Sequence, residues 1–235
     1  MSEKAQVILE RLQALSNPDN VAGMARFGIN PHDTLGISIP SLRQIAKEIG
    51  RDHALAVELW DTGIHEARLL AGFIADPRQM SEALLDRWVQ DFDSWDICDQ
   101  TCGLFVRTPF AYTKAFEWSS RPETFIKRAG FVLIATLAVH DKRAADERLA
   151  QFLPLIAREA SDERNFVKKA VNWALRQIGK RSLSLNGQAI ETARQIQQID
   201  NKAARWVAAD VLRELTSAPV QARLQAKAGQ QAVLK

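Results

Sequence analysis

The sequence predicts an all-α protein, built as a curved α-solenoid, and two observations support this. After Pro40 apolar residues recur at helical spacing almost without interruption, whereas the short β-branched runs that indicate strands are missing. A phrase in which a charged residue precedes a small residue and then an apolar ridge also recurs along the chain. Internal repetition of this kind is typical of stacked helix pairs.

The first helix is expected from Glu3 to Leu15, where the apolar residues lie three or four positions apart, and Pro18 ends that pattern. Residues 23–31 contain glycine and proline and predict a short, turn-rich connection. Further helices are then expected at Ser41–Ile49, Ala54–Trp60, Ile64–Ala75, Ser81–Asp91, Trp95–Val106 and Phe110–Trp118.

The recurring phrase opens helices at Glu66–Ala71, Lys127–Phe131, Lys168–Trp173 and Lys202–Trp206. Its alanines lie about 41 residues apart between Ala129 and Ala170, and about 34 apart between Ala170 and Ala204. The longer step before Ala129, about 62 residues from Ala67, leaves room for one more unit that contains Trp95. These periods indicate HEAT-like (armadillo-like) repeats, in which alanine lets neighbouring helices approach closely.

We expect these repeats to form a single domain over residues 1–235, with residues 219–235 as a tail that frays. Two cysteines, Cys98 and Cys102, are too few for a zinc site and indicate reduced thiols in or near the core. The first residues lack the apolar run of a signal peptide, and no segment reaches the length of a membrane span. A cytoplasmic protein with no membrane partner is therefore expected.

The distribution of charge is more informative than its sum. A formal net charge of +3 does not by itself require a nucleic-acid partner. Basic residues nevertheless gather in the recurring helices or at their ends, and the acids gather elsewhere, for example from Asp86 to Asp99. A set of such positions on one surface predicts a basic groove, although single lysines at helix starts are more often simply solvated. The basic residues of the recurring helices and their ends are Lys127, Arg128, Lys168, Lys169, Arg176, Lys180, Arg181, Lys202 and Arg205.

The segment from Asp93 to Gln100 combines a tryptophan with carboxylates in one turn of helix. Trp95 and Asp99 are four residues apart and share a helix face, whereas Asp96 lies on a neighbouring stripe. Two interpretations remain open for this segment alone. It is either a core tryptophan beside solvated aspartates, or a site in which a carboxylate lies next to an indole.

Taken together, the helix openings and the segment Trp95 to Asp99 resemble the bacterial AlkD-type alkylpurine DNA glycosylases of the DNA alkylation repair family. The resemblance extends over most of the chain, and it depends on the order and spacing of its motifs rather than on any one of them. The matching segments are Met24 to Phe27, Leu35 to Ile37, Trp95 to Asp99, Lys127 to Ala129 and Lys169 to Arg176.

The resemblance implies a curved helical solenoid that holds double-stranded DNA and removes positively charged N3- or N7-alkylated purines. It makes Asp99 the catalytic aspartate and Trp95 and Trp173 the aromatic groups of the groove. It also implies that Arg128 and Arg176 contact the DNA backbone, and Lys169 is expected to join them. The cationic base is already a good leaving group, so an ionised Asp99 has only to stabilise the oxocarbenium character of the sugar and to hold or activate the attacking water.

The family differs from most glycosylases because it does not flip the base into a pocket, and this sequence shows no cluster of residues that would build one. We expect no metal or other cofactor, and we interpret His32, His53, His65 and His140 as surface or capping residues. Asp96 is expected in a packing or capping role and Phe27 in the core. A clamp of this kind needs no partner subunit, so a monomer is expected.

Two other function classes fit a helical solenoid and stay open. The first is a non-catalytic protein that binds distorted or branched DNA, and the second is a protein-interaction scaffold. The residues also do not discriminate between a small methyl lesion and a bulky adduct, or between N3 and N7 substitution.

Overall fold

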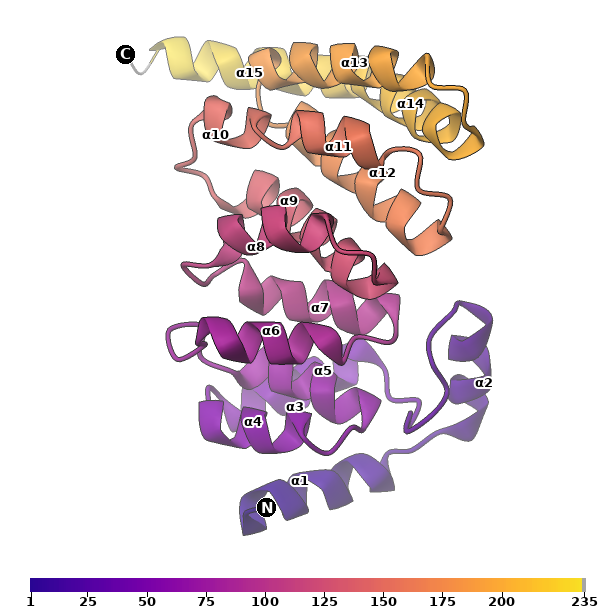
Figure 1. The fold of residues 1–235 in the computed structure, drawn as a ribbon. Coiled ribbons are helices and arrows are strands. Elements are labelled where there is room, and N and C mark those ends of the chain that lie inside the picture. The colour runs from indigo at the N-terminus through magenta and orange to yellow at the C-terminus, as the bar shows by residue number, and fades with distance from the viewer. Residues whose placement is uncertain (234–235) are drawn as a thin grey trace. The chain divides into compact units, whose positions relative to one another are not determined.

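The computed structural model describes residues 1–233, which form helices joined by short loops, with no strand among them (Figure 1). The prediction of an all-α, HEAT-like fold is confirmed. The helices are α1 (Glu3–Ala14), α2 (Pro18–Arg26), α3 (Ile39–Ile49), α4 (His53–Trp60), α5 (His65–Ile74), α6 (Glu82–Gln90), α7 (Trp95–Phe105), α8 (Ala111–Ser119), α9 (Thr124–His140), α10 (Asp146–Ala150), α11 (Leu153–Glu159), α12 (Asn165–Gly179), α13 (Leu183–Gln197), α14 (Lys202–Leu215) and α15 (Ala218–Val233).

Helix starts follow the local capping chemistry of the sequence. Ser38, Asp52 and Ser81 each accept a hydrogen bond from a backbone N–H group in the first turn of the helix that follows them. Such caps satisfy donors that have no partner inside the helix. The expected helix bounds before residue 120 therefore lie close to the observed ones.

The segment after α1 is different from the prediction. Residues 18–26 form helix α2, whereas the sequence predicted only a connection from Gly23. Asn17 accepts hydrogen bonds from the backbone N–H groups of Asp19 and Asn20, and Pro18 occupies the first helical position, which suits its fixed φ and missing N–H. The proline that ends one helix thus begins the next. No residue of α2 is buried, so its apolar pattern is weak.

The helices group into two compact units, which divide after Phe110. In the first unit, α5 packs against α3, α4 and α7, and α1 packs against α4. Its core contains the stacked indoles of Trp60 and Trp88, whose centroids are 4.0 Å apart. Helix α7 contains Trp95 and lies between the first recurring phrase and the second, as the long step in the repeat predicted. The expectation of a single domain stays a prediction.

In the second unit, α12 packs against α9 on one side and α14 on the other, while α8 covers α9 and α13 covers α12 and α14. Contacts between successive repeats join residues separated by 38 positions, as in the pairs Asn172 with Asp210 and Arg176 with Glu214. The repeats therefore also determine which side chains of neighbouring helices lie opposite each other.

Glycine allows one of the closest helix contacts in this unit. A Cβ atom added at Gly130 of α9 would collide with the backbone of Ser119 in α8.

At the other end of the unit, α15 occupies most of the segment predicted as a fraying tail and buries Leu224. Residues 234 and 235, the end of that segment, lie outside the described residues.

Cys98 and Cys102 are both buried and form no disulfide, as expected. Among the described residues, no helix combines the length and the apolar character needed to cross a membrane.

Candidate nucleic-acid interface

One candidate surface is the start of α7, in the first unit. Ser94, which precedes the helix, is buried, and its hydroxyl group accepts a hydrogen bond of 2.9 Å from the backbone N–H of Asn30. One residue later, the indole Nε1 of Trp95 donates to the carbonyl oxygen of Phe27 at 3.1 Å. The orientation of the Trp95 ring is therefore set by a contact with a segment almost seventy residues earlier in the chain.

Trp95 and Asp99 lie on the same side of α7, as their spacing predicted. Both are half-buried, whereas Ile97, Cys98 and Thr101 on the opposite side are buried. The indole and the carboxylate thus line the accessible face of a helix whose other face belongs to the core. Below, we call Trp95 and Asp99 the α7 row.

Asp96 has the packing role predicted for it. Its side chain is 8 % exposed, and one carboxylate oxygen lies 2.9 Å from Nε2 of His65, which is 3 % exposed. The other oxygen, Oδ1, is buried without a hydrogen-bond partner among the described residues. The prediction that His65 is a surface or capping residue is wrong, because this histidine is buried under the start of α7. The spacing along either helix gives no signal for a pair that is 31 residues apart.

Burial lowers the pKa of His65, but the hydrogen bond and the charge of Asp96, together with Glu66 and Asp93, outweigh it. The net effect raises the pKa of His65 above its ordinary value of 6.5. Protonated His65 would neutralise the buried Asp96 carboxylate directly behind the α7 row.

Glu66, a member of the first recurring phrase, holds the connection that precedes α3. Its carboxylate accepts hydrogen bonds of 2.7 Å from the backbone N–H of Leu35, 2.7 Å from that of Gly36 and 3.2 Å from that of Ile37. Gly36 has φ of +80°, and a Cβ atom there would collide with Asn17. This part of the site was missed from the sequence, although a carboxylate in a repeat phrase that otherwise carries lysine was a usable signal.

The prediction that Phe27 lies in the core is wrong, because its side chain is 74 % exposed. Phe27 follows the last residue of α2, and Gly28 beside it has φ of +79°, so the chain turns here before it reaches the core. The residue whose carbonyl group accepts the Trp95 hydrogen bond therefore carries an exposed aromatic ring.

A separate candidate surface is one face of α12, in the second unit. Lys169 is exposed, and Trp173 and Arg176 are half-buried, whereas Ala170, Val171 and the rest of the opposite face are buried. Positions 169, 173 and 176 lie four and three residues apart, so their side chains stack along the helix. Below, we call Lys169, Trp173 and Arg176 the α12 row.

Cations in this row and beside it have partners on α14. Arg176 pairs with both Glu214 and Asp210, and Lys180 pairs with Glu214 at 2.9 Å. Nζ of Lys168 lies 4.9 Å from the centroid of the Trp206 ring, in cation–π geometry. Glu214 in turn raises the pKa of Arg176 through their hydrogen bond.

Several basic residues of the predicted groove are not free surface charges. The ammonium group of Lys127 lies 2.6 Å from Glu159 and 3.5 Å from Asp162. Arg128 is only 6 % exposed and donates to the backbone oxygen of Phe166 at 2.6 Å. Arg181 is buried as well. Part of the basic set therefore stabilises the packing of the repeats, and the basic groove stays a prediction.

The model of the family described as "DNA alkylation repair enzyme" matches residues 8–215 of the chain, which contain both the α7 row and the α12 row. The chain belongs to this family. The match extends from the middle of α1 to the end of α14 and leaves out residues 1–7 and 216–235.

A solved structure gives independent support for the fold. It is described as one of a new family of proteins related to the HEAT-like repeat DNA glycosylases with affinity for branched DNA structures. The two chains are 22% identical, with a TM-score of 0.75 over 89% of this chain and 94% of the other. At this identity the likeness concerns the fold. No curated protein sequence matches the chain.

Proposed function

We propose that this member of the DNA alkylation repair family is a monofunctional DNA glycosylase that acts on cationic N3- or N7-alkylated purines in double-stranded DNA. The observation that carries the proposal is the α7 row. An aspartate and a tryptophan lie one helical turn apart on the accessible face of a helix whose start is held by polar contacts, among them the buried pair of Asp96 with His65. The family match over residues 8–215 supports the proposal.

Asp99 would act on the sugar rather than on the base. Alkylation at N3 or N7 already gives the purine a positive charge, so the base leaves without protonation by an acid. The deoxyribose gains positive charge as the C1′–N bond breaks, and the Asp99 carboxylate would stabilise this charge and hold or activate the attacking water. One carboxylate is sufficient here, in contrast to the pair used by glycoside hydrolases, because the leaving group is already activated.

Trp95 and Trp173 would supply the aromatic surface. The face of an indole attracts a cation and contacts the C–H groups of a sugar, so it favours a cationic lesion over an uncharged purine. The hydrogen bond from Trp95 to the Phe27 carbonyl restricts the rotation of that ring. This restriction would keep the Trp95 indole beside the Asp99 carboxylate throughout the reaction.

Lys169, Arg176 and Arg128 would contact the DNA backbone, which fixes position but carries no sequence information. Lys169 is already exposed. Arg176 would exchange Glu214 and Asp210 for a phosphate. We further propose that the protein acts as a monomer in the cytoplasm.

The second candidate is a DNA-binding protein without glycosylase activity that recognises branched DNA. Its support is the solved structure of similar fold, whose family has affinity for branched DNA structures. This candidate predicts salt-dependent binding without release of any base.

Base release from methylated duplex DNA tests the proposal. The parent protein should release 7-methylguanine or 3-methyladenine, and Asp99→Asn should slow release about a hundredfold under saturating protein. Asp61→Asn is the matched control, because Asp61 is a half-exposed carboxylate of the same unit that pairs with Arg87 on the surface. It should release the base at the parental rate.

Equal rates for the parent and Asp99→Asn would exclude the proposed role of Asp99. Tight, salt-dependent binding of a four-way junction by a parent that releases no base would instead establish the second candidate. A parent that neither releases a base nor binds DNA in a salt-dependent way would exclude both.

A further inference from the structure

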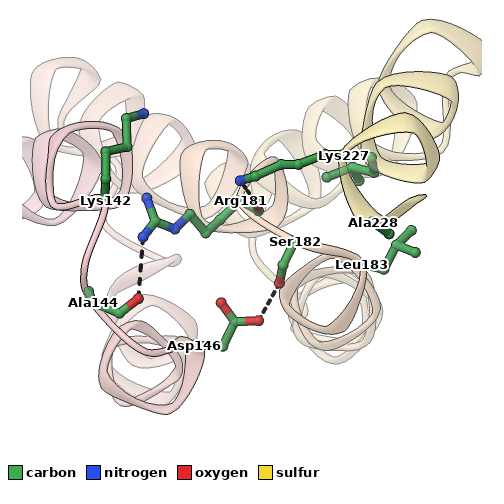
Figure 2. A pocket seen from close by; sticks show the side chains of 9 residues that line it. Lys142, Ala144, Asp146, Arg181, Ser182, Leu183, Lys227 and Ala228 are labelled. Carbon is green, nitrogen blue, oxygen red and sulfur yellow. Dashed lines mark hydrogen bonds between the residues drawn. The ribbon is translucent and has the colours of Figure 1, made fainter. Parts of the chain in front are cut away.

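A basic pocket lies in the second unit, at the C-terminal ends of α9 and α12 and against α15. It consists of two adjoining cavities of about 310 and 290 Å³ that share four lining residues. Figure 2 shows Lys142, Arg181 and Lys227 around the first cavity, with Ser182 and Asp146 along one side. Three of the four shared residues carry a positive charge, namely Lys142, Arg181 and Lys227, and the fourth is Leu224.

The charge of the pocket is strongly unbalanced. The second cavity adds Arg223 and Lys180, the latter paired with Glu214, so five cations line the pocket and one of them has an acidic partner outside it. Asp146 is the acid that lines it, and this carboxylate accepts a hydrogen bond from Ser182. Within the described part of the chain, no carboxylate forms an ion pair with Lys142 or Lys227. These two ammonium groups are therefore available to an anion.

Hydrogen bonds to backbone oxygens hold two of these cations in place. Arg181 is 8 % exposed and donates to the backbone oxygens of Asp141 at 2.7 Å and Ala144 at 3.3 Å, so its guanidinium is fixed at the end of α9. Lys227 donates to the backbone oxygen of Arg181 at 2.6 Å, which joins α15 to the end of α12. Burial, then the charges of Arg181 and Lys142, lower the pKa of Lys227. Like charges have thus been brought together without full neutralisation.

The start of α13 adds to the positive field. Ser182 caps this 15-residue helix by accepting from the backbone N–H of Leu185, and Leu183, its first residue, lines the first cavity. The N-terminus of a helix carries a partial positive charge and unsatisfied N–H groups, and both favour an anion such as phosphate. Lysines, an arginine and a helix N-terminus therefore face the same cavity.

The position of the pocket indicates where such an anion would come from. Arg181 follows Trp173 by eight residues, which corresponds to about 12 Å along a helix axis. Lys180 both follows the α12 row and lines the second cavity. A DNA strand along that row would reach the pocket within about three to four base pairs of Trp173.

We propose that this basic pocket binds backbone phosphates of a DNA strand that extends beyond the α12 row. The inference rests on the proposed DNA-binding function and adds a contact to it. The pocket is remote from the α7 row in sequence, so it would contribute to affinity and leave the chemical step to Asp99. A free compound with phosphate groups is the other source of the same chemistry.

The test compares two double variants that remove the same charge. The pocket variant is Lys142→Ala with Lys227→Ala. The control is Arg143→Ala with Arg194→Ala, since Arg143 is next to Lys142 in the chain but lines neither cavity, and Arg194 is an exposed residue of α13. Binding of a duplex is measured at several salt concentrations. The pocket variant should lose about two units of the slope of log K against log salt, and the control should keep the parental slope.

A third variant, Lys142→Arg with Lys227→Arg, keeps the charge and should keep the slope, which separates loss of charge from loss of folding. Equal slopes for the pocket variant and the control would overturn the proposal. Saturable binding of pyrophosphate by the parent together with equal slopes would also overturn it, and would assign the pocket to a free phosphate compound.

Base release distinguishes this inference from the proposed function. Under saturating protein, the pocket variant should release 7-methylguanine at the parental rate. A parent that releases no base, with slopes that still differ between the two variants, would refute the glycosylase and leave the pocket assignment standing.

Discussion

The α7 row and the α12 row both put a tryptophan on the accessible face of a helix, but the two helices are held in different ways. Behind α7 the contacts are buried, as in the pair of His65 with Asp96. Beside α12 the contacts are half-exposed ion pairs, in which the Arg176 side chain is 33 % exposed. The difference would suit the two proposed tasks, because a catalytic carboxylate needs a fixed position, whereas a cation that binds phosphate must be able to exchange its partner.

The two sets of contacts should also differ in how much the protein loses in stability when one of them is removed. Exposed and half-exposed ion pairs contribute little to stability because water screens them and both side chains lose freedom. Breaking a buried pair leaves an uncompensated charge in a medium that cannot solvate it. The start of α7 should therefore be the more sensitive of the two regions to a single substitution.

The largest expected effect is on stability. Asp96→Ala should lower the free energy of unfolding by about 3 kcal/mol, because it leaves His65 buried without its partner. Arg176→Ala should lower it by less than about 1 kcal/mol. Urea denaturation of both variants measures the difference, and equal losses would show that the two regions are not held differently.

The next effect is on the chemical step. Trp95→Ala should slow release of 7-methylguanine about tenfold under saturating protein, since a desolvated cation–π contact contributes up to about 2 kcal/mol. Trp95→Phe should keep most of the rate. Trp206→Ala is the control, because Trp206 is an exposed indole of α14 under Lys168. A control that slowed release as much as Trp95→Ala would contradict the assigned role.

A smaller effect is expected on affinity. Glu214→Gln should tighten duplex binding by about two- to fivefold, because Arg176 and Lys180 would no longer have to break ion pairs with Glu214 before they contact phosphate. Glu191→Gln, which affects the exposed Arg194 on α13, should leave affinity unchanged. Anisotropy titrations at one salt concentration measure both, and weaker binding by Glu214→Gln would show that this carboxylate positions Arg176 instead.

The smallest effect is a pH dependence at the start of α7. Because the pKa of His65 is raised in the folded protein, its charge contributes stability that is fully present below its ordinary pKa of 6.5. That contribution is lost as the pH rises through the higher, folded value. The difference in unfolding free energy between the parent and His65→Gln should therefore shrink from pH 5.5 to pH 8.5. A difference that grew with pH would show that folding favours the neutral form of His65 instead.

The successes and errors of the sequence-based prediction have separate physical origins. Asp96 was assigned correctly to packing because its stripe on α7 is offset from that of Trp95. The predictions for residues 18–26 and for Phe27 were wrong. An Asn-Pro pair can end one helix or begin the next, and the sequence does not reveal that it does both here. The exposure of Phe27 follows from the turn at Gly28. The site roles of Asp99, Trp95, Trp173, Lys169, Arg128 and Arg176 stay predictions.

Local periodicity by itself determined the helices, the recurring phrases and the shared face of Trp95 and Asp99, because neighbours along a helix are neighbours in sequence. Tertiary structure alone decided which charges are exposed. Arg176 meets Glu214 across 38 residues, and Lys227 comes beside Arg181 across 46. Such pairs depend on which helices pack together, so the sequence could indicate where the cations are but not which of them have partners.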